Sequence, residues 1–113
     1  MTWKYTNMKL TDLIEQINQS NTEQFLLNNS IDIEYDLIDI YAKEKLDISS
    51  EIEFFNAEEI PNEIFIKING VEYQNVCPLN MLEDIINDFK IQNSEIDTFE
   101  LTNQVLDYLE KDA

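Results

Sequence analysis

The sequence predicts an α+β domain, in which a small antiparallel sheet is packed by about four helices. An Asn-Gly pair separates two strand-like segments at about 64–76, and apolar residues recur at helical spacing elsewhere in the chain. The 113 residues are 43% hydrophobic, which suffices for one core. We therefore expect one acidic domain over residues 1–113, with a further strand at 51–55 and helices at 10–19, 34–46, 79–91 and 102–111.

The first helix is predicted over residues 10–19. Leu10, Leu13, Ile14 and Ile17 recur at i, i+3, i+4 and i+7, which places them on one helical face. A polar run from 18 to 22 then ends the pattern. Residues 23–30 are too short an apolar run to assign by period, and the conformation of 23–35 stays open.

The next segment carries two competing patterns. Residues 31–37 alternate like a strand, whereas Ile33, Leu37, Ile40 and Tyr41 follow helical spacing, and the longer pattern favours a helix at 34–46. Such a helix would place one row of carboxylates on a solvent-facing stripe, from Asp32, Asp36 and Asp39.

The hairpin is the most specific local signal. Residues 51–55 alternate charge with hydrophobe and predict a half-buried strand, and the hairpin follows. Asn-Gly suits a type I′ turn, because both central residues need positive φ. The predicted register pairs Ile68 with Val71, Ile66 with Tyr73, and Lys67 with Glu72.

Two helices are predicted after the hairpin. Pro78 precedes a segment in which Leu82, Ile85, Ile86 and Phe89 recur at helical spacing, which predicts the helix at 79–91. The helix at 102–111 presents a final apolar stripe from Val105, Leu106 and Leu109.

The composition argues against an enzyme. The chain has no histidine, no arginine and one glycine, which removes the usual general base, the bidentate phosphate clamp and glycine-rich nucleotide loops. We expect no cofactor and no metal: a loose calcium-loop pattern beginning at Asp32 fails at Leu37, where glycine is required, and at Lys43, where glutamate is required. Cys77, the one cysteine, is expected to be buried and inert, and the chain to be cytoplasmic.

The charge distribution carries the functional hypothesis. The net charge is −17. Residues 30–63 hold eleven acids and two lysines, and 83–113 hold nine acids and two lysines, whereas 64–82 are neutral. Such a field disfavours direct contact with nucleic acid or a membrane and favours a basic protein partner, with an oligomeric state that is left open. The expected contacts are the carboxylates Asp32, Asp36, Asp39, Glu51, Glu53, Glu58, Glu59 and Glu63.

Three functions fit this pattern. Carboxylate rows can stand in for phosphates, so the chain could block the nucleic-acid-binding surface of a basic protein as a DNA mimic. It could instead be an immunity protein that neutralises a basic nuclease toxin, since the physics is the same. It could also be a structural or assembly subunit with an ordinary solvated acidic surface.

The order of elements also resembles a known group. Residues 8–14 (MKLTDLI), 70–73 (GVEY) and 82–86 (LEDII), taken with the acidic composition, look like the small acidic anti-CRISPR proteins of phages and mobile elements. The resemblance is one of architecture and composition. It implies an inhibitor that covers the DNA-binding surface of a nuclease effector, and it implies no particular site residues, because that group shares no common motif.

Overall fold

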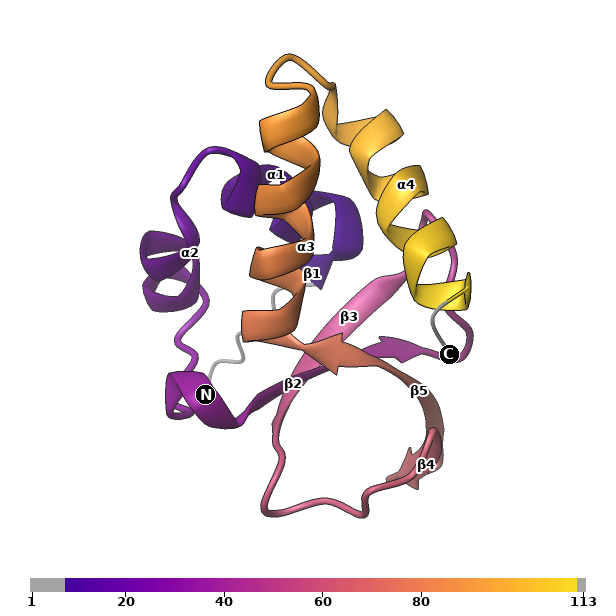
Figure 1. The fold of residues 1–113 in the computed structure, drawn as a ribbon. Coiled ribbons are helices and arrows are strands. Elements are labelled where there is room, and N and C mark those ends of the chain that lie inside the picture. The colour runs from indigo at the N-terminus through magenta and orange to yellow at the C-terminus, as the bar shows by residue number, and fades with distance from the viewer. Residues whose placement is uncertain (1–7, 112–113) are drawn as a thin grey trace.

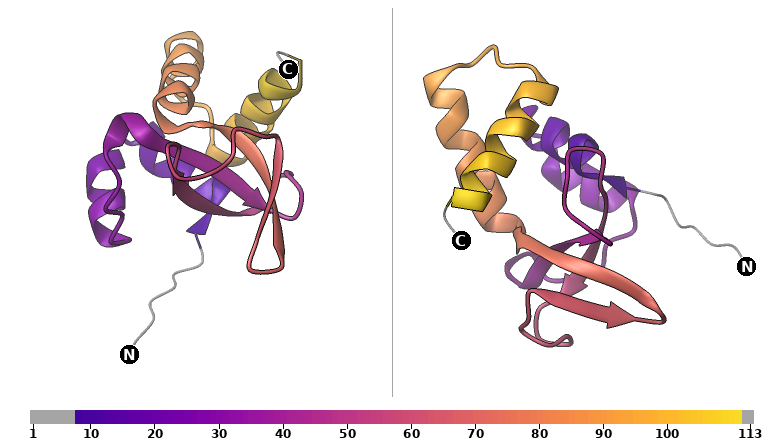
Figure 2. Two further views of the ribbon diagram at one scale, coloured as in Figure 1. Left: turned by 90° about the horizontal axis from the view of Figure 1, so that it is seen from below. Right: turned by 90° about the vertical axis from the view of Figure 1, so that its right-hand side faces the viewer.

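The computed structural model describes residues 8–111 and has one layer of helices on one side of a five-stranded antiparallel sheet (Figure 1). The strand order is β1-β3-β2-β5-β4, so β2 is central and β1 and β4 are the edges. Figure 2 shows α3 and α4 on the same side of the sheet. The elements are β1 (Met8–Lys9), α1 (Leu10–Asn18), α2 (Thr22–Asn28), the 3-10 helix η1 (Tyr35–Leu37), β2 (Ile38–Lys43), β3 (Glu51–Asn56), β4 (Phe65–Ile68), β5 (Val71–Pro78), α3 (Leu79–Gln92) and α4 (Thr98–Lys111). The predicted α+β class is confirmed; the predicted domain, 1–113, extends beyond the described residues at both ends.

The main core lies between the helices and the sheet. The apolar stripes of α1, α3 and α4 meet side chains of β2, β3 and β5, and Leu13, Leu82 and Leu101 are fully buried there together with Ile40. The predicted helices at 10–19 and 79–91 are confirmed within a residue at each end. Burial of these stripes, rather than helix propensity alone, stabilises helices of this length.

The last helix begins four residues before the predicted 102. The Asp97 carboxylate accepts a hydrogen bond from the Glu100 backbone N–H at 2.8 Å, so the helix is capped upstream. Thr102 is consequently an interior helical residue. It is completely buried, and its hydroxyl donates to the Thr98 carbonyl at 2.8 Å.

The hairpin has the predicted register. Ile68 pairs with Val71, and Lys67 pairs with Glu72. Asn69 and Gly70 have φ values of 53° and 83°, the left-handed conformations that the type I′ turn requires. Both β4 and β5 therefore follow from local chemistry.

The predicted helix at 34–46 is wrong. Only Tyr35–Leu37 is helical, as a single 3-10 turn, and the chain then continues as the central strand β2. Ile38 and Ile40 face the helices, while Tyr41 is buried on the opposite face. Apolar residues on both faces blur the two-residue period of a strand and imitate helical spacing. Pairing with β3 and β5 on either side decides in favour of the strand.

The segment that the sequence left open, 23–35, contains most of α2 and the start of η1. Its apolar side chains Phe25 and Leu26 pack against the main core, and Leu27 is exposed. The helix is anchored mainly on α1.

Candidate functional site

The face of the sheet opposite the main core gathers acidic residues. In the β2–β3 register Asp39 pairs with Phe55 and Tyr41 pairs with Glu53, so these four side chains lie on one face. Lys43 and Glu51 extend the same face, and their charged groups are 3.7 Å apart. Directly paired residues on such a face have Cβ atoms about 5 Å apart.

An aromatic cluster forms the centre of this face. The Tyr41 ring meets Phe55 edge to face with centroids 5.5 Å apart, and Phe55 meets Tyr73 in the same way at 5.2 Å. Tyr41 is 1% exposed and belongs to a second apolar cluster with Ile66, separate from the main core. The carboxylates therefore border an apolar, desolvated surface.

The connection between β3 and β4 packs on this second cluster. Ile60 contacts it, and the Tyr41 hydroxyl donates to the Glu63 carbonyl at 3.5 Å. In Figure 1 this connection runs along the bottom of the molecule between the two strands. The carboxylates of Glu58, Glu59 and Glu63 are exposed on it. We call the three strand residues Asp39, Glu51 and Glu53 the acidic sheet face.

The structure places three of the eight predicted site residues, Asp39, Glu51 and Glu53, on one face of the sheet, whereas Glu58, Glu59 and Glu63 lie on the connection between β3 and β4. Asp32 lies between α2 and η1, and Asp36 lies in η1, and both are exposed. The predicted helical row of Asp32, Asp36 and Asp39 does not form, because Asp39 belongs to β2. Sequence reasoning missed the aromatic centre, because Tyr41, Phe55 and Tyr73 come from three different strands that only the sheet pairing brings together.

Burial perturbs two of these carboxylates. Burial raises the pKa of Asp39. Burial also raises the pKa of Glu53, and attraction to Lys43 offsets only part of this effect. Lys43 is thus shared between Glu51 and Glu53. The two partly buried carboxylates, Asp39 and Glu53, therefore lack full compensation by a positive charge.

Ion pairs are scarce across the described part of the chain. Two are formed there, Lys43 with Glu51 and Lys111 with Asp107. The sequence holds 24 acidic residues against 7 basic ones. The negative charge is therefore largely uncompensated within the molecule and available to an external cation.

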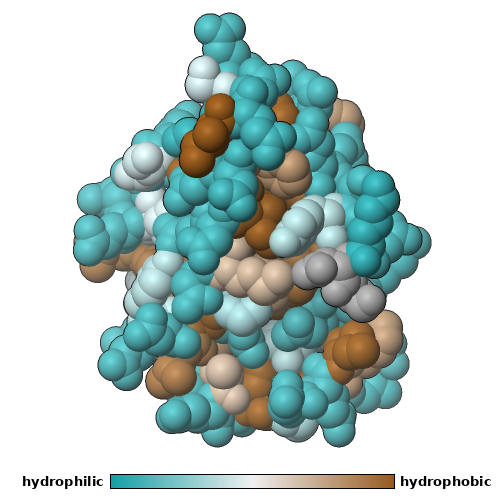
Figure 3. Space-filling view, in the orientation of Figure 1, coloured by the Kyte–Doolittle hydropathy of each residue, from teal (hydrophilic) through white to brown (hydrophobic). Residues whose placement is uncertain are grey.

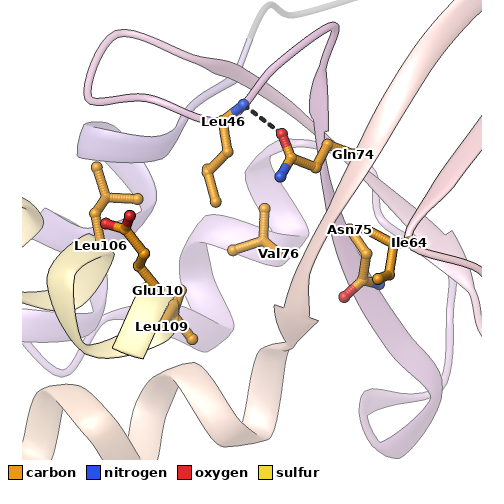
Figure 4. A pocket seen from close by; sticks show the side chains of 8 residues that line it. All are labelled: Leu46, Ile64, Gln74, Asn75, Val76, Leu106, Leu109 and Glu110. Atoms are coloured by element: carbon orange, nitrogen blue, oxygen red, sulfur yellow. Dashed lines mark hydrogen bonds between the residues drawn. The ribbon is translucent and has the colours of Figure 1, made fainter. Parts of the chain in front are cut away.

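An apolar groove of about 510 Å³ lies between the end of α4, β5 and the start of β4 (Figure 4). Leu106 and Leu109 of α4 face Val76 of β5 across it, and Ile64 closes the side next to β4. The Gln74 side-chain oxygen accepts a hydrogen bond from the Leu46 backbone N–H at 2.9 Å and fixes the adjoining loop. Such a groove suits an apolar side chain rather than acid–base chemistry.

Cys77 is buried, as the sequence predicted. The residue shift between Ile40 and Tyr41 in the pairing of β2 with β5 marks a bulge, which lets both Val76 and Cys77 enter the main core. Burial, with the Asp39 charge as a second cause, raises the pKa of the Cys77 thiol to about 12. The thiol is therefore protonated near neutral pH.

Residues 8–111 contain neither a clustered set of metal ligands nor a helix that could cross a membrane. Within that range, acidic and cysteine side chains form no group of three or more that could hold a metal ion. Over the same range, each helix is too short or too polar to cross a bilayer.

Comparison of the chain with protein-family models, with curated proteins and with solved structures found no match.

Proposed function

We propose that this protein is a non-enzymatic binding protein whose acidic sheet face covers a basic, nucleic-acid-binding surface of another protein. The observation that carries the proposal is the pair of partly desolvated carboxylates, Asp39 and Glu53, which lie beside Tyr41 on one face of the sheet; attraction to Lys43 offsets part of the effect at Glu53. Holding carboxylates in this way costs free energy in the isolated protein. A lysine or arginine from a partner would recover that free energy on binding.

The geometry of the sheet supports a phosphate-like arrangement. Residues two apart on one strand, such as Glu51 and Glu53, project from the same face about 6.8 Å apart, and adjacent strands are about 4.8 Å apart. This spacing is comparable with that of neighbouring phosphates along one nucleic-acid strand. A surface that binds a phosphate backbone could therefore accept the acidic sheet face in its place.

The aromatic cluster also favours binding, because it fixes the positions of the carboxylates. Tyr41 and Phe55 hold the surrounding strand residues in fixed positions, so the carboxylates need little ordering when a partner arrives. Tyr41 is itself 1% exposed, so the cluster acts by positioning the carboxylates rather than by touching the partner. If the partner is a nuclease effector, as the anti-CRISPR resemblance implies, the protein would act as an inhibitor in the cytoplasm.

The test is affinity capture from a host lysate at low and high salt, with charge variants of the bait. The triple variant Asp39→Asn, Glu51→Gln and Glu53→Gln should lose a basic nucleic-acid-binding protein that the unmodified chain retains at low salt. A matched control removes three charges from the helical layer instead, by Asp84→Asn, Asp88→Asn and Glu100→Gln, all exposed.

The comparison of the two variants decides the outcome. Capture that survives the helical-layer changes and is lost with the sheet-face changes supports the proposal. Equal capture by both variants, or capture that is independent of salt, contradicts it. A captured nuclease effector supports the DNA-mimic inhibitor, and a captured nuclease toxin supports the immunity alternative.

A further inference from the structure

We infer that the free edge of β4 accepts an extended basic segment of a partner protein as an additional strand. This inference rests on the proposed function, because it names how the basic partner makes contact. β4 is last in the strand order, and Figure 2 shows it at the border of the sheet. A peptide added to such an edge gains main-chain hydrogen bonds with little rearrangement of the sheet.

The β4 backbone presents unpaired groups in the required pattern. The Asn75 N–H donates to the Ile64 carbonyl at 2.7 Å, which identifies a hydrogen-bonded pair in the β4–β5 register. In an antiparallel ladder such pairs recur at every second residue, so the N–H and C=O groups of Phe65 and Lys67 point away from β5. The edge therefore offers two donors and two acceptors to an incoming strand.

Exposed apolar side chains stand at the same edge. Ile64 is 66% exposed and Phe65 is 60% exposed, whereas most large apolar side chains of the described residues are buried or partly buried. Figure 3 shows hydrophobic surface at the lower right, in the region of the β4–β5 hairpin. Ile64 also lines the groove beside α4. An added strand would place every second side chain on the same face as Phe65, and the residue paired with Phe65 is favoured to be apolar.

The acidic residues around β4 favour a basic segment as the added strand. Residues 57–68 hold three glutamates, Glu58, Glu59 and Glu63, and one base, Lys67. This surplus attracts lysine or arginine in the remaining positions of an added strand. Pairing of β4 with a second copy would bring together two chains of net charge −17, so the acids that favour a basic segment oppose self-association.

The probe is a capped peptide of alternating lysine and valine, about eight residues long, which matches a typical strand. Titration into 15N-labelled protein should slow hydrogen exchange of the Phe65 and Lys67 amides at least about tenfold. A peptide of alternating glutamate and valine should leave both amides unchanged. Sedimentation of the protein without peptide should give a monomer.

Two variants at one position separate strand addition from charge attraction. Lys67→Pro removes the outward N–H without removing a bond to β5, a position where an edge strand tolerates proline. Lys67→Thr removes the same charge and keeps the N–H. Lys67→Pro should bind the lysine-valine peptide at least about tenfold more weakly than Lys67→Thr, with the amide spectrum of β5 retained in both.

Each contrary result has a distinct meaning. Equal affinity of the two variants, no binding of the lysine-valine peptide, or dimerisation of the free protein through β4 would overturn strand addition. None of these results touches the capture experiment with Asp39, Glu51 and Glu53, on which the proposed function depends. Loss of capture in that triple variant with unchanged capture by Lys67→Pro would retain the proposed function and reject this inference.

Discussion

Truncation of Tyr41 tests whether the second apolar cluster stabilises the fold from the face opposite the helices. The side chain is 1% exposed and contacts Phe55 edge to face. Replacing a buried aromatic side chain by alanine typically costs about 3–5 kcal/mol in the free energy of unfolding. We expect Tyr41→Ala to fall in this range. Tyr41→Phe should cost about 0.5 kcal/mol, because its hydroxyl bond to Glu63 spans 3.5 Å, which is long for an O–H donor.

The assay is urea denaturation followed by circular dichroism. With a denaturant dependence of about 2 kcal/mol per M, a loss of about 4 kcal/mol lowers the midpoint by about 2 M. Tyr108→Ala is the control, because that side chain is 42% exposed and pairs only loosely with Phe89, with ring centroids 6.4 Å apart. A cost below about 1 kcal/mol for Tyr41→Ala, no larger than that of Tyr108→Ala, would refute the second cluster as a stabilising core.

Three further predictions concern charge, turn and thiol. Because burial raises the pKa of Asp39 and Glu53, the folded state takes up protons at a higher pH than the unfolded state; the free energy of unfolding should therefore rise as pH falls from 7 through the folded-state pKa values. Asp39→Asn with Glu53→Gln should stabilise the protein at pH 7 and flatten this rise in urea titrations at pH 7 and 5, and an unchanged slope would contradict the burial of both charges. Gly70→Ala should cost about 1 kcal/mol from the positive φ of 83° alone, since an added Cβ meets nothing within 4 Å, and a thermal melt that shows no loss would exclude the type I′ turn. Cys77 should react with a thiol reagent only on unfolding, so rapid modification of the native protein at pH 7 would show that it is accessible.

The strand at residues 38–43 determines which carboxylates share a surface. A helix there would have presented Asp32, Asp36 and Asp39 as one exposed row. As a central strand, β2 instead leaves Asp36 in the preceding turn and places Asp39 among aromatic side chains. The two carboxylates whose pKa burial raises, Asp39 and Glu53, therefore come from two strands rather than from one helix.

Several elements were predictable because their determinants are local. The Asn-Gly pair specifies its own turn, and the turn sets the register of Lys67 against Glu72. The stripes of the helices at 10–19 and 79–91 recur within three or four residues. The start of α4 was missed because its cap, Asp97, precedes the apolar pattern.

The α+β class, the hairpin and the helical stripes could be predicted from local sequence patterns, and the net charge of −17 follows from composition alone. Pairing between distant strands, in contrast, makes residues 38–43 the central strand and puts Asp39, Glu51 and Glu53 on one face. The physical reason is that a strand is completed by neighbours distant in the chain. β2 pairs with both β3 and β5, and the spacing of Ile38, Ile40 and Tyr41 in the sequence does not reveal either partner strand.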